Sequence, residues 1–185
     1  MSDPLEPSAE PPRAVCGIIV PEGLNDANLA NMNSATLIAN LLYTYAERMD
    51  AGDFKGAADL FTHATIRRMR GDKEVLLTSR DLLEHWKEVV IVYPDGTPRT
   101  KHVVTNPIIE VDEDKGTATS RSYYTVFQQT HEVPLQPVAS GRYHDRFERV
   151  DGKWRFVYRD YSMLDMVGSI GRHVRRYGNQ TTNNA

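Results

Sequence analysis

The chain has 185 residues, of which 40% are hydrophobic and 25% charged, with one cysteine and a formal net charge of −3. This length predicts a single globular domain whose core needs neither disulfides nor a structural metal. A mildly acidic chain lacks the broad basic surface that nucleic-acid binding usually requires. No stretch approaches the roughly 18 consecutive apolar residues of a membrane span. We therefore expect a cytoplasmic protein with no nucleic-acid partner and no membrane partner.

The two ends of the chain differ in composition from the part between them. Residues 1–24 contain five prolines, which remove backbone donors and disfavour helix, so this segment is expected to be a flexible arm. Residues 178–185 are polar and lack apolar anchors, which predicts a disordered tail. The folded domain is expected between them, over residues 25–177.

Helical spacing dominates the first part of this domain. Asn33 or Ser34 can cap a helix whose apolar residues recur three and four positions apart, and Ser79 can cap a later one. Glycine and polar residues mark the ends of these segments. We expect three helices, at residues 34–51, 54–61 and 80–89.

From Arg99 onward the pattern changes to period two, with β-branched and aromatic residues. Asp151 and Gly152 form a hairpin turn between the last two expected strands. Helices followed by strands indicate an α+β fold with a curved antiparallel sheet rather than alternating βαβ units. The strands are expected at residues 101–111, 117–130, 140–150 and 153–161, with a closing helix at 163–176. On the last two strands, the expected inward set is Gly141, Tyr143, Asp145, Phe147, Arg155, Val157 and Arg159.

Two residues form a candidate catalytic pair. Asp50 ends the first expected helix, where the carbonyl dipoles raise the pKa of a carboxyl and favour a partner. His102 begins a strand, and a carboxylate that accepts from one imidazole nitrogen leaves the other nitrogen as a general base. Spacing alone favours a surface aspartate at a helix end and an edge-strand histidine with no such role.

Three segments in order resemble the SnoaL-like branch of the NTF2-like superfamily: MDAGDF at residues 49–54, KHVVTN at 101–106, and GRYHDRFERVDGKWRF at 141–156. This branch includes scytalone dehydratase and a dehydrochlorinase, and it borders the β subunits of ring-hydroxylating dioxygenases. The resemblance covers residues 34–163. It implies an NTF2-like cone, in which a curved sheet wraps the N-terminal helices around a deep apolar pocket.

The resemblance also implies roles for particular residues. Asp50 and His102 match the family's proton-abstracting pair, and Arg159 matches an arginine that steadies a departing anion. Met49 stands where scytalone dehydratase has a tyrosine, and that enzyme's second histidine has no clear counterpart. By the same alignment, the substrate-binding walls would comprise Tyr123, Thr125, Phe127, Tyr143 and Val157.

Each of these residues also has a simpler interpretation. Tyr143 could be satisfied by protein groups alone, and Asp145 and Arg159 could pair only to neutralise each other. His144 alternates with Tyr143 and is expected on the outer face. The other histidines lie on expected helix surfaces or loops, without the spacing of a metal site, at His63, His85, His131 and His173.

The resemblance implies a lyase or isomerase of the dehydratase or dehydrohalogenase kind, with no cofactor and no metal. The substrate would be a small apolar molecule of cyclic or polyketide-like structure, and the protein would form a homo-oligomer, either a trimer or a dimer. Two alternatives remain open at this point. The chain could be a non-catalytic, β-subunit-like partner of a ring-hydroxylating dioxygenase, or it could bind a small molecule without turnover.

Overall fold

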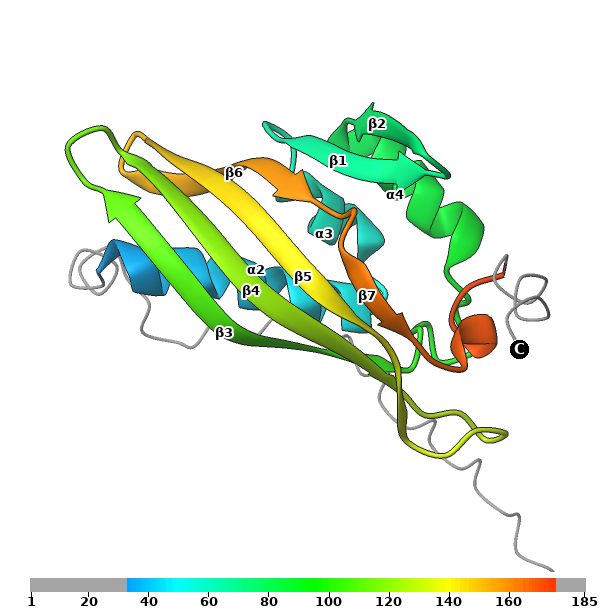
Figure 1. Ribbon diagram of the computed structural model, residues 1–185. Helices are drawn as coiled ribbons and strands as arrows, with labels where there is room; N and C mark the ends of the chain where they lie inside the picture. Colours follow the sequence, from blue (N-terminus) through cyan, green and yellow to red (C-terminus); the bar gives the residue numbers. More distant parts are fainter. Residues whose placement is uncertain (1–32, 176–185) are drawn as a thin grey trace, which may run out of the picture.

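The computed structural model describes residues 33–175, and within this range the chain forms three α-helices, seven strands and one 3-10 helix (Figure 1). The expected arm and tail lie outside the described residues. No helix in this range is long and apolar enough to span a membrane. In chain order the elements are α2 (Ser34–Asp50), α3 (Phe54–Asp59), β1 (Thr65–Arg70), β2 (Lys73–Leu77), α4 (Ser79–Val89), β3 (Thr100–Asp112), β4 (Thr117–Gln128), β5 (Gln136–Val150), β6 (Lys153–Asp160), β7 (Leu164–Val167) and η1 (Ile170–Arg172).

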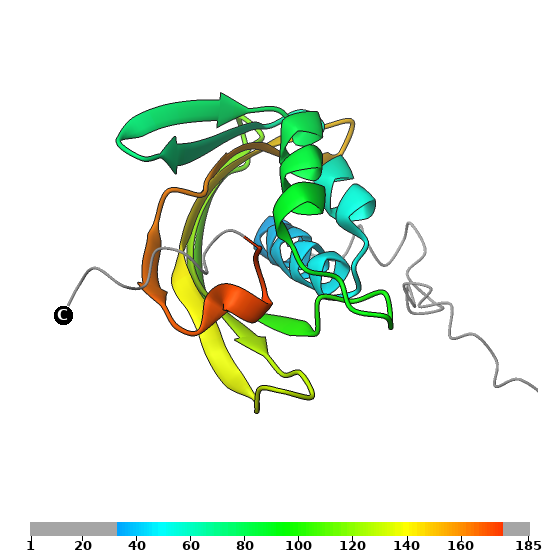
Figure 2. The same ribbon diagram turned by 90° about the vertical axis from the view of Figure 1, so that its right-hand side faces the viewer.

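One sheet contains all seven strands, in the order β2-β1-β6-β5-β4-β3, with β7 paired to β5 beside this path. Neighbouring strands are antiparallel, except that β1 pairs with β6 in parallel. The four strands that the sequence predicted, β3 to β6, are antiparallel as expected, and the pairing of β1 with β6 makes the sheet mixed. Figure 2 shows that it curves around α2, while α3 and α4 lie on the same concave side.

The helices form where the sequence supplies both a cap and an apolar face. The side chain of Asn33 accepts a hydrogen bond from the backbone N–H of Thr36 at 2.8 Å and so caps α2. Thr78, rather than the expected Ser79, caps α4, because Thr78 and Asp81 form a reciprocal capping box. The face that α2 turns toward the sheet is buried and comprises Ile38, Leu42, Tyr45, Ala46 and Met49.

Two segments differ from the sequence-based expectation. The β1–β2 hairpin was not predicted, because its strands carry many basic residues and only Ile66 is fully buried among them. The closing helix expected at 163–176 is wrong. Gly168 and Gly171 weaken a helix there, by about 1 kcal/mol each relative to alanine. The chain instead pairs as β7 with residues 139–141 of β5 and then forms the short η1.

The inward-facing set on β6 is also partly wrong. Tyr143, Asp145 and Phe147 of β5 are buried, as predicted. The pairing between β5 and β6, however, shifts register between Arg146 and Phe147. Such an irregularity reverses which residues point inward. The buried residues of β6 are Trp154, Phe156 and Arg159, whereas Arg155 and Val157 are only partly buried.

Candidate active site

An aspartate and a histidine that are 52 positions apart in the sequence meet at the end of α2. The Nδ1 atom of His102 lies 2.6 Å from Oδ1 of Asp50, and the two side chains are only 7% and 8% exposed. The backbone N–H of His102 donates to Oδ2 of Asp50 at 2.8 Å. The hydroxyl of Thr100 donates to Oδ1 at 2.8 Å. Three donors from β3 thus hold this carboxylate.

Close packing of two turns brings β3 to the end of α2. Gly52, directly after the helix, has a φ of +76°, which glycine adopts without steric cost. A Cβ atom at this position would lie 2.2 Å from the carbonyl oxygen of Gly96. The loop that leads into β3 therefore packs directly against the turn after α2. This packing sets Thr100 and His102 beside Asp50.

These contacts fix the charge of Asp50 and the tautomer of His102. Burial by itself would raise the pKa of Asp50, but the hydrogen bonds and charge of His102, together with Thr100, lower that pKa below its usual value. Because the ionised carboxylate only accepts hydrogen bonds, Nδ1 of His102 carries the proton that they share. The second ring nitrogen, Nε2, is then free to accept a proton.

His102 lines a pocket of about 370 Å³ on the concave side of the sheet. This volume lies in the range of small-molecule sites. The elements that form the pocket are α2, α4, β1, the strands β3 to β5 and the C-terminal segment, which surround the same concave region in Figure 2. Its walls are mainly apolar and aromatic, with Met49, Leu82, Trp86, Val90, Val126 and Ala139 among them.

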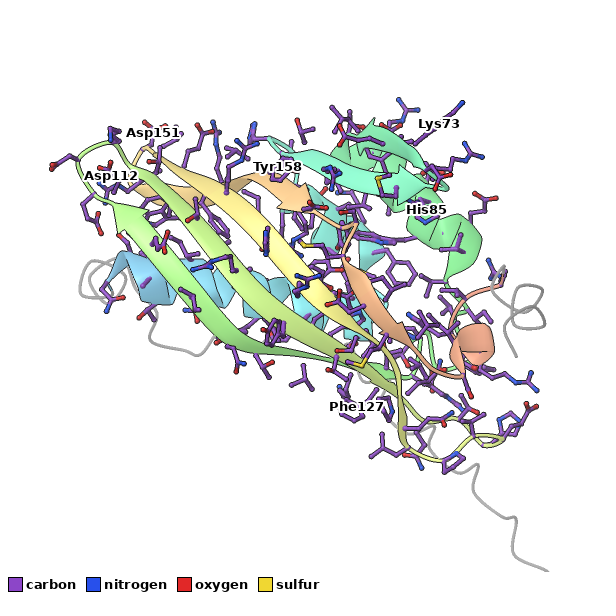
Figure 3. The ribbon with its side chains drawn as sticks, in the orientation of Figure 1. Lys73, His85, Asp112, Phe127, Asp151 and Tyr158 are labelled. Atoms are coloured by element: carbon purple, nitrogen blue, oxygen red, sulfur yellow. The ribbon has the colours of Figure 1, made fainter. Side chains whose placement is uncertain are left out.

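The pocket adjoins a second hollow of about 590 Å³ between the β1–β2 hairpin and α4. Both are lined by Met69, His85 and Val89, so the boundary between them lies along α4. Figure 3 shows His85 on α4, beneath the hairpin. On this side of the cone, the pocket that contains His102 therefore borders a second hollow.

Of the residues predicted to line the pocket, Tyr143 does so. On β4, the residues that line the pocket lie one position away from those that the sequence predicted. Tyr124 and Val126 line the pocket, whereas Tyr123 is 54% exposed on the opposite face of the strand. Thr125 and Phe127 share the face of Tyr123, because side chains alternate along a strand. Figure 3 shows Phe127 at the end of β4 that leads into the β4–β5 connection.

Val157 and Arg159, the two predicted site residues on β6, lie outside this pocket. Val157 lines a separate hollow beside β3 and β4, together with Glu110 and Arg146. Arg159 is fully buried and donates two hydrogen bonds to Asp145, at 2.7 and 2.8 Å. The structure thus places Arg159 in the ion pair that sequence reasoning left open as an alternative, and not where it could meet a pocket occupant.

The environment of Arg159 explains how a charge is tolerated there. Its guanidinium carbon lies 4.2 Å from the ring centre of Tyr143 and 4.6 Å from that of Tyr45. Burial alone would lower the pKa of Arg159, but the charge and hydrogen bonds of Asp145 raise it well above its ordinary value. The aromatic faces stabilise the same cation. Asp145 and Arg159 therefore form a buried ion pair that packs against the rings of Tyr45 and Tyr143.

The hydroxyl groups of three tyrosines, Tyr45, Tyr143 and Tyr161, lie close together beside this ion pair. Tyr161 donates a hydrogen bond from its hydroxyl to that of Tyr45, and Tyr45 also bonds to Tyr143. Burial raises the pKa of all three phenols well above 10.0, so they stay protonated at neutral pH. The hydroxyl of Tyr143 therefore has a protein partner, which was the simpler interpretation of this residue.

One pocket residue was assigned no role from the sequence. His173, expected on a helix surface or in a loop, is 8% exposed and lines the same pocket as His102. Only the segment after β6, folding back over the sheet, brings it there. No local pattern indicates this, because the neighbouring residues suggest a helix. Within residues 33–175, no group of three or more His, Cys, Asp or Glu side chains is arranged to hold a metal ion.

A curved sheet wrapped around a long helix, with a pocket on its concave side, defines the NTF2-like class of folds. Residues 31–160 match the SnoaL-like domain, and the chain therefore belongs to the SnoaL-like family. A comparison with curated proteins found no match.

Solved structures share this fold. A protein of unknown function from Mycobacterium tuberculosis is 24% identical, with a TM-score of 0.56, over 83% of this chain and 81% of its own. A candidate scytalone dehydratase from Novosphingobium aromaticivorans is 21% identical, with a TM-score of 0.54, over 77% and 89% of the two chains. The β subunit of a candidate aromatic-ring-hydroxylating dioxygenase from the same organism is 15% identical, with a TM-score of 0.57, over 78% and 94%. At these identities the likeness concerns the fold alone.

Proposed function

We propose that this protein is a cofactor-independent lyase or isomerase, in which His102 removes a proton from a carbon atom of a small, largely apolar and cyclic substrate. The observation that carries the proposal is the 2.6 Å contact between Nδ1 of His102 and Asp50 at the wall of the pocket. Asp50 orients the ring and stabilises the imidazolium that forms when Nε2 takes the proton. The fold it shares with a candidate scytalone dehydratase supports the same class of reaction.

The environment of the pair suits this chemistry. In a mainly apolar pocket, a carboxylate and an imidazolium attract each other more strongly than they do in water. General base catalysis contributes about a hundredfold to ten-thousandfold in rate. Exclusion of water and stabilisation of the developing anion would supply the remainder.

The proposal can be tested without knowing the natural substrate. The protein is incubated in D₂O with cyclic ketones such as cyclohexanone and 1-indanone, and NMR measures the exchange of protons next to the carbonyl. We expect His102→Gln to lower the exchange rate of the wild-type protein by about a hundredfold or more. His144→Gln, which changes an exposed histidine on the outer face of β5, is the matched control and should exchange at the wild-type rate.

Two results would overturn the mechanism. One is exchange by the wild-type protein at the rate of the buffer alone. The other is full exchange by the folded His102→Gln variant. If ketones bind in the pocket but no proton exchanges, the binding-protein alternative replaces the enzyme.

The outer face of the sheet supports the further proposal of a homo-oligomer, a dimer or a trimer. Val103 and Ile108 of β3 and Tyr123 of β4 are 41%, 54% and 54% exposed. Large apolar side chains gathered on one sheet face are typical of a surface that another subunit covers.

A further inference from the structure

The pocket contains a second imidazole, His173, which comes from a part of the chain remote from the Asp50 and His102 pair. After β6 the chain runs along β5 as β7, turns through η1 and places His173 directly after that turn. His173 and His102 line the same pocket. In Figure 2, η1 and the segment that follows it lie on the concave side of the sheet, opposite the β1–β2 hairpin.

Hydrogen bonds to two other parts of the fold, the loop after α4 and the end of β4, fix the backbone around His173. The carbonyl oxygen of His173 accepts from the N–H of Ile91 at 2.8 Å, in the loop after α4. The carbonyl oxygen of Arg172 accepts from Nε2 of Gln128 at 3.1 Å and from the hydroxyl of Tyr93 at 2.8 Å. The ring is therefore presented by an anchored segment.

One nitrogen of the His173 ring is buried without a hydrogen-bond partner in the described part of the chain. His173 is 8% exposed, and its Nδ1 atom is buried with no hydrogen-bond partner among residues 33–175. Buried polar atoms in native proteins are nearly always paired, so each unpaired one calls for an explanation, of which a catalytic role is one. The hydroxyls of Tyr45, Tyr143 and Tyr161, by contrast, bond to one another.

His173 is also held in its neutral form. Burial, and secondarily the charge of His102, lower its pKa to about 4, although the negative charge of Asp50 acts in the opposite direction. A neutral imidazole carries one N–H donor and one acceptor nitrogen. Such a donor can polarise a carbonyl oxygen without losing its own proton.

We propose that His173 donates a hydrogen bond from its neutral ring to the oxygen of a substrate carbonyl, and that the pocket is built for a small ketone with an acidic neighbouring C–H bond. This inference rests on the proposed function of His102. When Nε2 of His102 takes the proton, the electron pair of the C–H bond forms a new carbon–carbon π bond. The carbonyl π pair moves to oxygen, and the resulting enolate oxygen accepts the hydrogen bond from His173. Arg159 cannot serve this oxygen, because Asp145 and the aromatic wall enclose it.

A binding measurement tests His173 separately from catalysis. The probes are p-cresol, whose phenol oxygen imitates an enolate oxygen, and p-xylene, which has the same shape without that oxygen. We expect the wild-type protein to prefer p-cresol by about tenfold, as one added hydrogen bond would give. His173→Phe should lose this preference, whereas His173→Gln, which keeps an N–H donor, should retain part of it. His144→Gln, on the outer face of β5, should keep the preference.

The proton-exchange assay with 1-indanone supplies the second readout. Loss of a donor to the developing oxyanion costs a well-studied enzyme about a hundredfold to a thousandfold, and we expect a loss of that order in His173→Phe. Equal binding of the two probes by the wild-type protein would overturn the assignment of His173, and so would an unchanged preference in folded His173→Phe. If proton exchange survives in His102→Gln while the p-cresol preference still depends on His173, the assignment of His102 as the base fails and that of His173 as the hydrogen-bond donor stands.

Discussion

Two buried aspartates in this fold hold cationic or basic partners, and their surroundings differ. Asp145 and Arg159 are both fully buried, and each of their two hydrogen bonds joins one member of the pair to the other. Asp50 and His102 are nearly as buried, but among residues 33–175 only Nδ1 of the His102 ring has a hydrogen-bond partner, and the ring lines a pocket. Burial and pairing therefore do not distinguish the proposed catalytic pair from the structural one. What distinguishes them is an unused proton acceptor beside space for a ligand.

The largest loss of stability is expected when the ion pair of Asp145 and Arg159 is broken. Arg159→Met leaves the carboxylate of Asp145 buried without its cation, and we expect the free energy of unfolding to fall by about 3–5 kcal/mol. Urea denaturation measures this. Arg146→Met is the matched control, because Arg146 lies on the outer face, stacked at 4.3 Å over the ring of Tyr158. That change should cost about 1 kcal/mol or less.

Replacing the basic partner of Asp50 should destabilise the fold less than replacing that of Asp145. In His102→Gln, Asp50 keeps the backbone N–H of residue 102 and the hydroxyl of Thr100 as donors. We therefore expect a loss of only about 1–2 kcal/mol. If Arg159→Met proved no more costly than His102→Gln, the account of Arg159 as a structural residue would fail.

A further effect, on stability at low pH, concerns His173. The folded-state pKa of about 4 lies below the ordinary value of 6.5. Between these values the unfolded chain binds more protons at this residue, so the free energy of unfolding must fall as the pH falls from 6.5 to 4. At pH 4.5 this contribution is about 2–3 kcal/mol. Urea denaturation measures the free energy of unfolding at pH 7.5 and at pH 4.5. We expect its decrease between the two pH values to be smaller by that amount in His173→Gln than in the wild-type protein. An identical loss in both proteins would contradict the burial of a neutral His173.

The sequence predicted those parts of the fold that depend on local patterns. Apolar spacing and capping residues located α2, and period-two alternation located β3 to β6. Asp50 and His102 came from motif resemblance, since no spacing rule links residues that meet only through tertiary packing.

The remaining errors have physical causes. Alternation along β4 gives two possible faces, and the aligned choice of Tyr123 selected the outer one. On β6 a register shift reversed the direction of Val157. His173 was missed because its position depends on β7 pairing with β5, a long-range contact that no local pattern indicates.

The central claim is that Asp50 holds the proton on Nδ1 of His102 and leaves Nε2 free toward the pocket. Nitrogen-15 NMR of the histidine rings at neutral pH, with His102 assigned through His102→Gln, measures this tautomer directly. The account predicts that neutral His102 carries its proton on Nδ1 in the wild-type protein and loses this preference in Asp50→Asn. A wild-type His102 with its proton on Nε2, or one whose tautomer is indifferent to Asp50→Asn, would contradict the account.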